Sequence, residues 1–370
     1  MRILRSLSTA FGLVAALGLA AGPASAQVAS GQLSPNYKNL IDNGNFNIYQ
    51  RGTTAVTGIT TTATYHADRW AGYSGTATSM SLTNITSSLP PTTLNAPVFS
   101  NAEQVQRTAA QTGVLPVCLV QEIPTSEIKP INEPVTLSFW ALAGSNFSAA
   151  SSVLTATVST GTGTDQGLAS FISGWTGAAV PVTLPATLTT SWQRFAVTGV
   201  IPATATEAAV TFCFTPVGTA GANDYFQVTG VQIEQGTAAT NIEWRPAGVE
   251  LAKVQRYAYA IQEGTITAGT VMAPAGQAPS ATTCLISIPF PVTMRAAPTY
   301  TNTLTASTFK LNSAAVNTAL STPFSATTGV NTVFNGSVTF TASGLGATAG
   351  FGCELVSAAG SGSMVFTADF

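Results

Sequence analysis

Short runs in which apolar and polar residues alternate recur along most of this chain, separated by stretches rich in Gly, Pro, Asn and Thr. Alternation with a period of two is typical of β-strands that bury one face. Helical spacing is rare. The pattern predicts an all-β protein whose clearest strands lie at residues 104–107, 117–123, 135–143, 153–159, 192–200, 207–214 and 225–234.

One segment breaks this pattern just after Pro246 and Gly248. Leu251, Val254 and Ala258 follow one another at helical spacing within a cluster of charged residues. This predicts a short helix that connects two domains. Strand-like runs then resume, so we expect a β-sandwich in residues 38–247, a helical connector in 248–260 and a smaller C-terminal β-sandwich in 261–370, with strands at 283–289, 299–304, 333–341 and 364–370.

Residues 1–26 have the pattern of a secretory signal peptide. Arg2 and Arg5 precede an apolar stretch at 11–21, and Ala24 and Ala26 form a small-residue cleavage site. We expect residues 27–37 to be a linker and the mature protein to be secreted, periplasmic or on the cell surface.

Export would allow the four cysteines to form disulfides. Four cysteines permit three pairings, but a domain boundary near residue 250 places two of them in each half. This favours the pairs Cys118–Cys213 and Cys284–Cys353. The alternative is four buried free thiols.

The chain is poor in charge: 13 Lys and Arg with 15 Asp and Glu make up 8% of its 370 residues, against about 25% in a typical domain. Nucleic-acid binding needs clustered basic residues, so this composition excludes it. Beyond the signal peptide, no run is long and apolar enough to predict a transmembrane helix. We therefore expect a polar but uncharged surface.

The segment Asn39-Leu40-Ile41-Asp42-Asn43-Gly44-Asn45-Phe46 begins a series of motifs that continues at 47–53, 65–70, 135–141, 161–163, 192–195, 226–234, 243–246 and 250–257. The opening resembles the first strand of family 4/9 carbohydrate-binding modules, and the whole series resembles a module of phage tail-fibre and minor tail proteins. The resemblance implies a jelly-roll sandwich that binds surface glycans without catalysis. Because phage tail proteins carry no signal peptide, we expect an exported relative of that module.

Sugar-binding modules use aromatic rings, because one face of a sugar is apolar. Trp140 is the leading candidate, since alternation in the strand at 135–143 points it away from the predicted core, among small hydroxylic neighbours. Trp175 and Tyr73 lie in loop-like, Gly-flanked settings and are further candidates. Packing is the alternative for all three, and it is the expected role of Trp70, Trp192 and Trp244.

Jelly-roll modules related to the resembled family often hold a structural calcium ion, which needs six to eight oxygen ligands. Asp224, before the last strand of the sandwich, and Asp42 and Asn45, near the first, are the expected ligands of Ca²⁺. The alternative for Asp224 is a loop cap. No cofactor is expected to be required.

Catalytic candidates are few. A glycosidase needs two carboxylates about 5–10 Å apart, and Glu122 and Glu234, expected on neighbouring strands, are one such pair that nothing distinguishes. His66 is the only histidine, and no G-x-S-x-G motif surrounds a serine. We therefore expect a protein that is not an enzyme.

The leading hypothesis is an exported protein that binds a carbohydrate or another cell-surface polymer. Low charge, Thr-rich sheet edges and the trimeric state of tail fibres favour a homotrimer. One alternative is a structural protein of an extracellular layer. Another is an association with the outer membrane through the C-terminal strand, in which Met364, Phe366, Ala368 and Phe370 share one face.

Overall fold

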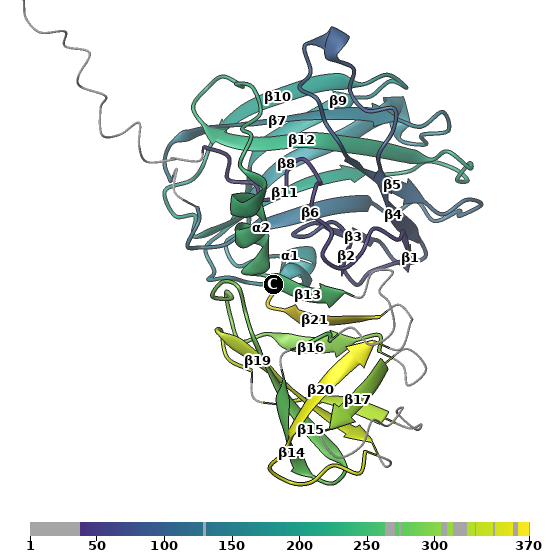
Figure 1. The fold of residues 1–370 in the computed structure, drawn as a ribbon. Coiled ribbons are helices and arrows are strands. Elements are labelled where there is room, and N and C mark those ends of the chain that lie inside the picture. The colour runs from purple at the N-terminus through teal and green to yellow at the C-terminus, as the bar shows by residue number, and fades with distance from the viewer. Residues whose placement is uncertain are drawn as a thin grey trace, which may run out of the picture. The chain divides into compact units, whose positions relative to one another are not determined.

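The computed structural model describes residues 38–128, 131–262, 271–273, 275–304, 309–313, 324–329, 331–342, 345–357 and 362–369. The predicted signal peptide and linker, and Phe370, lie outside these residues. Strands greatly outnumber helices in the described part of the chain, which confirms the all-β fold class (Figure 1).

The first β region consists of two six-stranded antiparallel sheets. One has the order β1-β4-β5-β12-β7-β10 and the other β2-β3-β6-β11-β8-β9. From β5 onward the chain passes repeatedly from one sheet to the other, as in a jelly roll. The strands are β1 (Val56–Ile59), β2 (Thr64–Tyr65), β3 (Ala71–Ser74), β4 (Met80–Ile85), β5 (Ala102–Arg107), β6 (Val117–Ile123), β7 (Pro134–Ala143), β8 (Val153–Gly161), β9 (Ala179–Thr187), β10 (Gln193–Val200), β11 (Glu207–Phe214) and β12 (Tyr225–Gln235).

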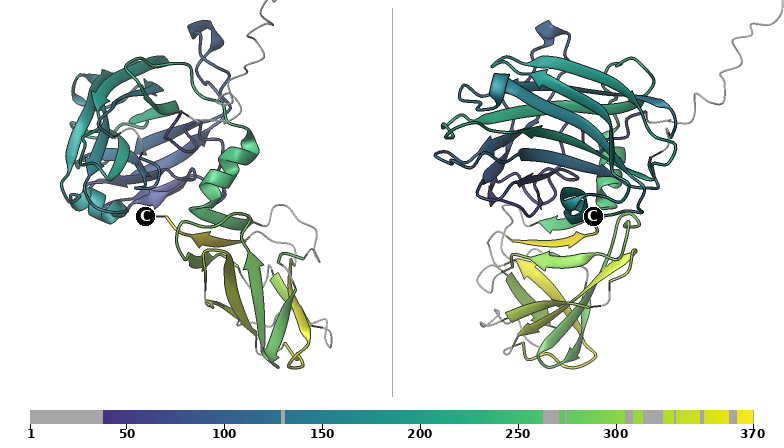
Figure 2. Two further views of the ribbon diagram at one scale, coloured as in Figure 1. Left: turned by 90° about the vertical axis from the view of Figure 1, so that its left-hand side faces the viewer. Right: turned by 180° about the vertical axis from the view of Figure 1, so that it is seen from behind.

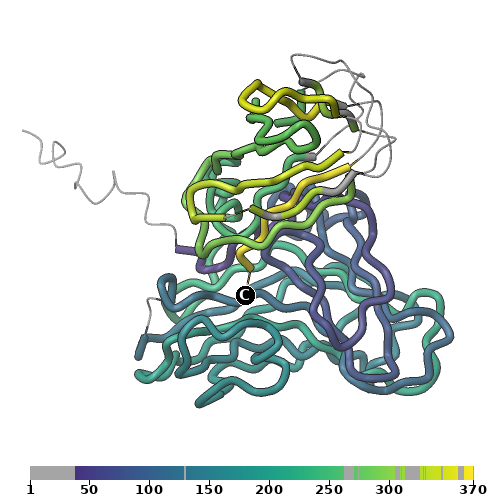
Figure 3. Tube along the Cα trace, turned by 90° about the horizontal axis from the view of Figure 1, so that it is seen from below, coloured from purple at the N-terminus to yellow at the C-terminus, as the bar shows by residue number. Residues whose placement is uncertain are grey.

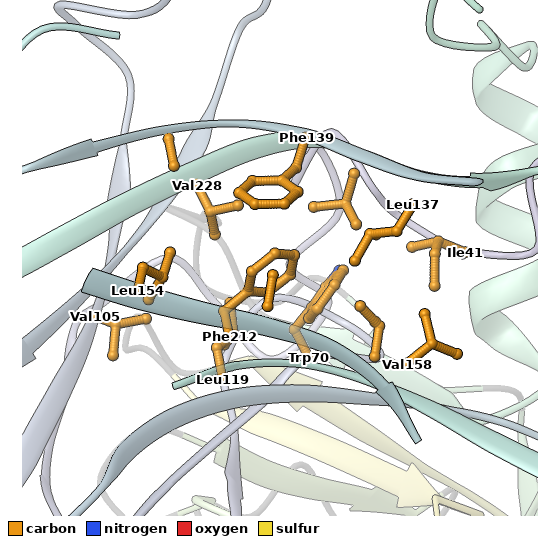
Figure 4. Packing of buried hydrophobic residues seen from close by; sticks show 14 of the residues in the cluster. Ile41, Trp70, Val105, Leu119, Leu137, Phe139, Leu154, Val158, Phe212 and Val228 are labelled. Carbon is orange, nitrogen blue, oxygen red and sulfur yellow. The ribbon is translucent and has the colours of Figure 1, made fainter. Parts of the chain in front are cut away.

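The two sheets enclose one apolar core. Leu137 and Phe139 of β7 belong to it, and the ring of Phe139 lies 4.8 Å from that of Phe212 on the opposite sheet (Figure 4). Trp70 is fully buried beside Phe212. Its Nε1 donates to the carbonyl of Asn43 at 3.1 Å, so the core also fixes the N-terminal loop.

After the first region come α2 (Ala247–Gln255) and two further antiparallel sheets (Figure 2). These sheets have an apolar core of their own. Their orders are β13-β21-β16 and β17-β20-β14-β15-β19-β18, so segments far apart in the sequence lie side by side (Figure 3). The strands are β13 (Ala258–Gln262), β14 (Gly276–Ser280), β15 (Thr283–Pro289), β16 (Thr299–Asn302), β17 (Phe309–Ser313), β18 (Phe324–Thr328), β19 (Asn335–Ala342), β20 (Gly352–Ser357) and β21 (Ser363–Thr367).

Both disulfides favoured by the sequence are present. Cys118 of β6 and Cys213 of β11 are directly opposite one another, with Cα atoms 4.2 Å apart. Cys284 of β15 is bonded to Cys353 of β20. No helix within the described residues is long and apolar enough to span a membrane.

The alternation pattern predicts the observed bounds of β6, β11 and β15. The predicted helix is α2, but it ends at Gln255, and Ala258, which was expected on the helix, begins β13. It missed β9, because Pro181 and Pro185 argue against a strand; β9 is an edge strand, where proline is tolerated. It also missed the short helix α1 (Leu168–Ser173), which follows a Gly- and Thr-rich stretch.

Candidate functional site

A cavity of about 280 Å³ opens between the N-terminal loop at residues 39–48 and the segment at 243–250. We call it the Trp244 pocket. A concave site with an aromatic ring and a few polar groups is the usual form of a small-molecule site. The lining consists of Asn39, Asn43, Gly44, Asn45, Asn47, Ile48, Glu243, Trp244, Arg245, Ala247 and Glu250.

Asn43 fixes the shape of the N-terminal loop. It is buried and has a φ of 52°, in the left-handed region that asparagine tolerates better than most residues. Its Oδ1 accepts the backbone N–H groups of Asn47 at 2.8 Å and Ile48 at 3.1 Å, and its Nδ2 donates to the carbonyl of Asp68 at 3.0 Å. The side chain thereby supplies partners to backbone groups that a turn would leave unpaired.

A β-bulge in β12 joins this loop to the sheet. The register with β7 shifts between Thr229 and Gln232. Val231, inside the bulge, instead donates its N–H to the carbonyl of Gly44 at 2.9 Å and accepts from Nδ2 of Asn39 at 3.1 Å. A Cβ atom at Gly44 would overlap the carbonyl oxygen of Val231, so this close approach requires glycine.

Trp244 is held at the surface by the charged residues on either side of it. The side chains of Glu243 and Arg245 are 15% and 3% exposed, whereas Trp244 is 50% exposed. Glu243 accepts the backbone N–H of Asn39 at 3.0 Å, and Arg245 pairs with Glu250 at 3.1 Å. Because both neighbours are anchored toward the protein, the indole between them faces outward.

Behind the loop, Asp42 is buried among three cations. The nitrogens of Lys253, Arg69 and Arg245 lie 2.7, 3.4 and 3.7 Å from its carboxylate. Burial alone would raise the pKa of Asp42, but these cations together hold it below its ordinary value. The ionic groups near the pocket therefore neutralise one another.

Within the described residues, Asn45 Oδ1 is a buried pocket atom without a hydrogen-bond partner.

The structure contradicts a sugar groove at Trp140. The side chain does point away from the main core, but it is only 6% exposed. It packs with Leu142 and Trp192 and with Phe99, which belongs to the segment at residues 86–101; we call this segment the 86–101 loop. A ring covered in this way has no free face for a ligand.

Trp175 and Tyr73 do not line the Trp244 pocket either. Trp175 is 6% exposed, donates from Nε1 to the carbonyl of Gln166 at 2.9 Å and meets Phe171 of α1 edge-on. Tyr73 is half-buried on β3 opposite Cys118, and burial raises its pKa to about 12. Trp175 and Tyr73 pack in one apolar cluster and Trp140 in another, so the three predicted residues do not form one site.

The geometry gives the predicted Ca²⁺ no support. Asp224 accepts the N–H and Oγ–H of Ser148 at 2.9 and 2.7 Å and pairs with Arg107 at 3.2 Å. Asp42 faces the cations described above, and of the three expected ligands only Asn45 lines the pocket. In the part of the chain that the structure describes, no group of three acidic, His or Cys side chains is placed to hold a metal ion.

The carboxylates named from the sequence do not form a pair. Glu122 on β6 and Glu234 on β12 belong to different sheets, so the expected placement on neighbouring strands is wrong. His66 is buried. Both acids that line the pocket, Glu243 and Glu250, pair with Arg245.

Packing was the expected role of Trp244, but its side chain is half-exposed beside the pocket. Its signal was the motif Glu243-Trp244-Arg245, in which two charges flank a tryptophan in a chain with few charges. The sequence does not show that Glu243 and Arg245 both bind the backbone of the N-terminal loop, about two hundred residues away.

No protein-family model matches the sequence, and no curated protein matches it. About half of the chain is similar to solved structures at low identity. The family 11 carbohydrate-binding module of a cellulosomal cellulase from Clostridium thermocellum is 12% identical over 47% of this chain and 91% of that one, with a TM-score of 0.28.

Two other similar structures have different roles. The enzymatically active domain of tailspike protein 4 from bacteriophage CBA120 is 14% identical over 55% of this chain and 22% of that one, with a TM-score of 0.33. A cyclase from Fischerella sp. TAU is 12% identical over 54% of this chain and 97% of that one, with a TM-score of 0.35. At these scores the likenesses carry no weight on what this chain binds.

Proposed function

We propose that this protein binds carbohydrate and that the Trp244 pocket holds the sugar. The observation that carries the proposal is a half-exposed indole beside a cavity lined by four asparagines. A pyranose ring has an apolar C–H face, which stacks on an aromatic ring, and a rim of hydroxyl groups, which exchange hydrogen bonds with amides. Of these asparagines, Asn47 is exposed on the N-terminal loop and presents its amide to such a hydroxyl.

The proposal is binding without catalysis. General acid–base chemistry needs a carboxyl group with a free oxygen near the reacting atom. Glu243 is engaged by backbone N–H groups and by Arg245, and Glu250 by the same arginine and by the N–H of Asn43. These carboxylates therefore hold the pocket in shape and are not available to a substrate.

The charge distribution favours a neutral glycan. The cations nearest the pocket are occupied by Asp42, Glu243 and Glu250. The proposed setting is outside the cytoplasm, because the sequence has the pattern of a signal peptide and the fold contains two disulfides. Surface polysaccharides are the glycans that a secreted protein meets there. A homotrimer remains a prediction.

The test is a glycan array probed with residues 27–370 and with Trp244→Ala. Phe334→Ala is the matched control, because Phe334 is 66% exposed but does not line the pocket. We expect the parent and the control to bind a neutral glycan and Trp244→Ala to lose that binding while keeping the parent's circular dichroism spectrum. Equal glycan binding by all three proteins would show that the Trp244 pocket is not the glycan site. Failure of the parent to bind any glycan would favour the alternative, a structural protein of an extracellular layer.

A further inference from the structure

The 86–101 loop touches the Trp244 pocket at two points. The ring of Phe99 lies 6.0 Å from that of Trp244. Nδ2 of Asn101 donates to Oδ1 of Asn47, another lining residue, at 2.9 Å. The loop therefore lies next to two residues that line the pocket. It is the blue segment that projects beyond the strands at the top of Figure 1.

The loop is held in one conformation at both ends. Nε1 of Trp192 donates to the carbonyl of Ser88 at 2.6 Å, and Oγ1 of Thr229 donates to that of Asn101 at 2.8 Å. Prolines at positions 90, 91 and 97 restrict the backbone between them. A loop that is already ordered loses little conformational entropy when it contacts a ligand.

Apolar side chains on this ordered loop nevertheless face solvent. Val98 is 74% exposed and Leu94 is 46% exposed, close in sequence to the Phe99 that contacts Trp244. Residues 86–101 contain no Asp, Glu, Lys, Arg or His. A ligand at this rim therefore meets methyl groups and no charge, which fits the C–H face of a neutral sugar and not an ionic polymer.

We propose that the 86–101 loop extends the Trp244 pocket and that the ligand is a neutral oligosaccharide, with one ring in the pocket and a following ring against Val98. This inference rests on the proposed carbohydrate binding. It adds the ligand class: a chain of several rings is held better than a monosaccharide, because only a chain reaches from the pocket to the loop.

The experiment is an array of neutral oligosaccharides from one to six rings, in several linkage families, probed with the parent and Val98→Ser. Val180→Ser is the matched control, because Val180 is also exposed, at 54%, but lies on β9. We expect the parent's affinity to rise with chain length. Val98→Ser should weaken binding of the longer chains by roughly fivefold and leave monosaccharides unchanged, and Val180→Ser should match the parent.

Leu94→Ser provides a second variant in the same loop and should act in the same direction. Parent binding that is independent of chain length, or length dependence that both loop variants retain, would overturn this inference and leave the proposed function standing. Failure of the parent to bind any neutral glycan would overturn both. The two failures are therefore distinguishable in one data set.

Discussion

Nδ1 of His66 lies 2.7 Å from Oε1 of Glu103 inside the first sandwich, and both side chains are almost fully buried. The other oxygen of Glu103 accepts from the hydroxyl of Tyr49 at 2.9 Å. Burial raises the pKa of Glu103, although its bonds to His66 and Tyr49 oppose that effect. Glu103 belongs to β5 and His66 lies between β2 and β3, so this polar contact links the two sheets.

Glu103→Ala should lower the free energy of unfolding by about 3 kcal/mol, because it leaves His66 and Tyr49 buried without their shared partner. The measurement is urea unfolding at pH 7. Glu133→Ala, at an exposed glutamate, is the control and should change little. Equal effects of the two substitutions would show that the buried contact contributes nothing to stability.

Glu122 should make stability fall as pH rises. Burial raises its pKa to about 8, with Glu207 adding to the rise and Arg69 opposing it. A carboxyl with a higher pKa in the folded than in the unfolded state favours folding fully below about pH 4.5, and that contribution is lost as pH rises through about 8.

Glu122→Gln should therefore be more stable than the parent above pH 8 and should show a flatter pH profile between about 4.5 and 8. Denaturant midpoints across this range measure the difference. Profiles of parent and variant that run parallel would contradict the assignment of this pH dependence to Glu122.

Gly44→Ala should damage the Trp244 pocket, because the added Cβ overlaps the carbonyl of Val231. We expect a loss of about 1–3 kcal/mol in unfolding free energy together with weaker glycan binding. Gly248→Ala is the control, since its added Cβ meets no atom within 4 Å and it lies in α2, where alanine is favoured. Calorimetric unfolding and the glycan array give the two readouts.

Trp140→Ala should cost about 3–5 kcal/mol of stability by leaving a cavity under the 86–101 loop. Affinity of the folded fraction for a monosaccharide, which occupies only the pocket, should stay close to that of the parent, since Trp140 does not line the pocket. Trp244→Ala should instead lose glycan affinity and keep the stability of the parent. Loss of binding with intact stability in Trp140→Ala would restore a sugar site on the outer face of β7.

Strands such as β6, β11 and β15 were predictable because the residues that define them are neighbours in sequence, whereas β1, β2 and β3 are too short for alternation to show. Alternation in β7 correctly places Phe139 inside and Trp140 outside the main core. It says nothing about what lies over the outer face, which depends on a loop from elsewhere in the chain. Trp140 was therefore placed on the right face but given the wrong environment.

The site was less predictable, because it depends on long-range contacts. Residues 39–46 resemble a first strand in sequence, but in the structure they form a loop, which Asn43 shapes and Gly44 seats on β12. The exposure of Trp244 follows from partners of Glu243 and Arg245 that lie near residue 40. No local pattern records which distant backbone groups a charged side chain will reach.

The cations around Asp42 have a consequence for how this protein meets other molecules. Because Glu127, Glu243 and Glu250 also pair with these cations, the charges balance and little net field extends into solvent. Approaching polymers are then not steered from beyond the Debye length of about 8 Å at physiological salt. Encounter is governed by diffusion and by shape complementarity at contact, so ligand binding should depend little on salt concentration.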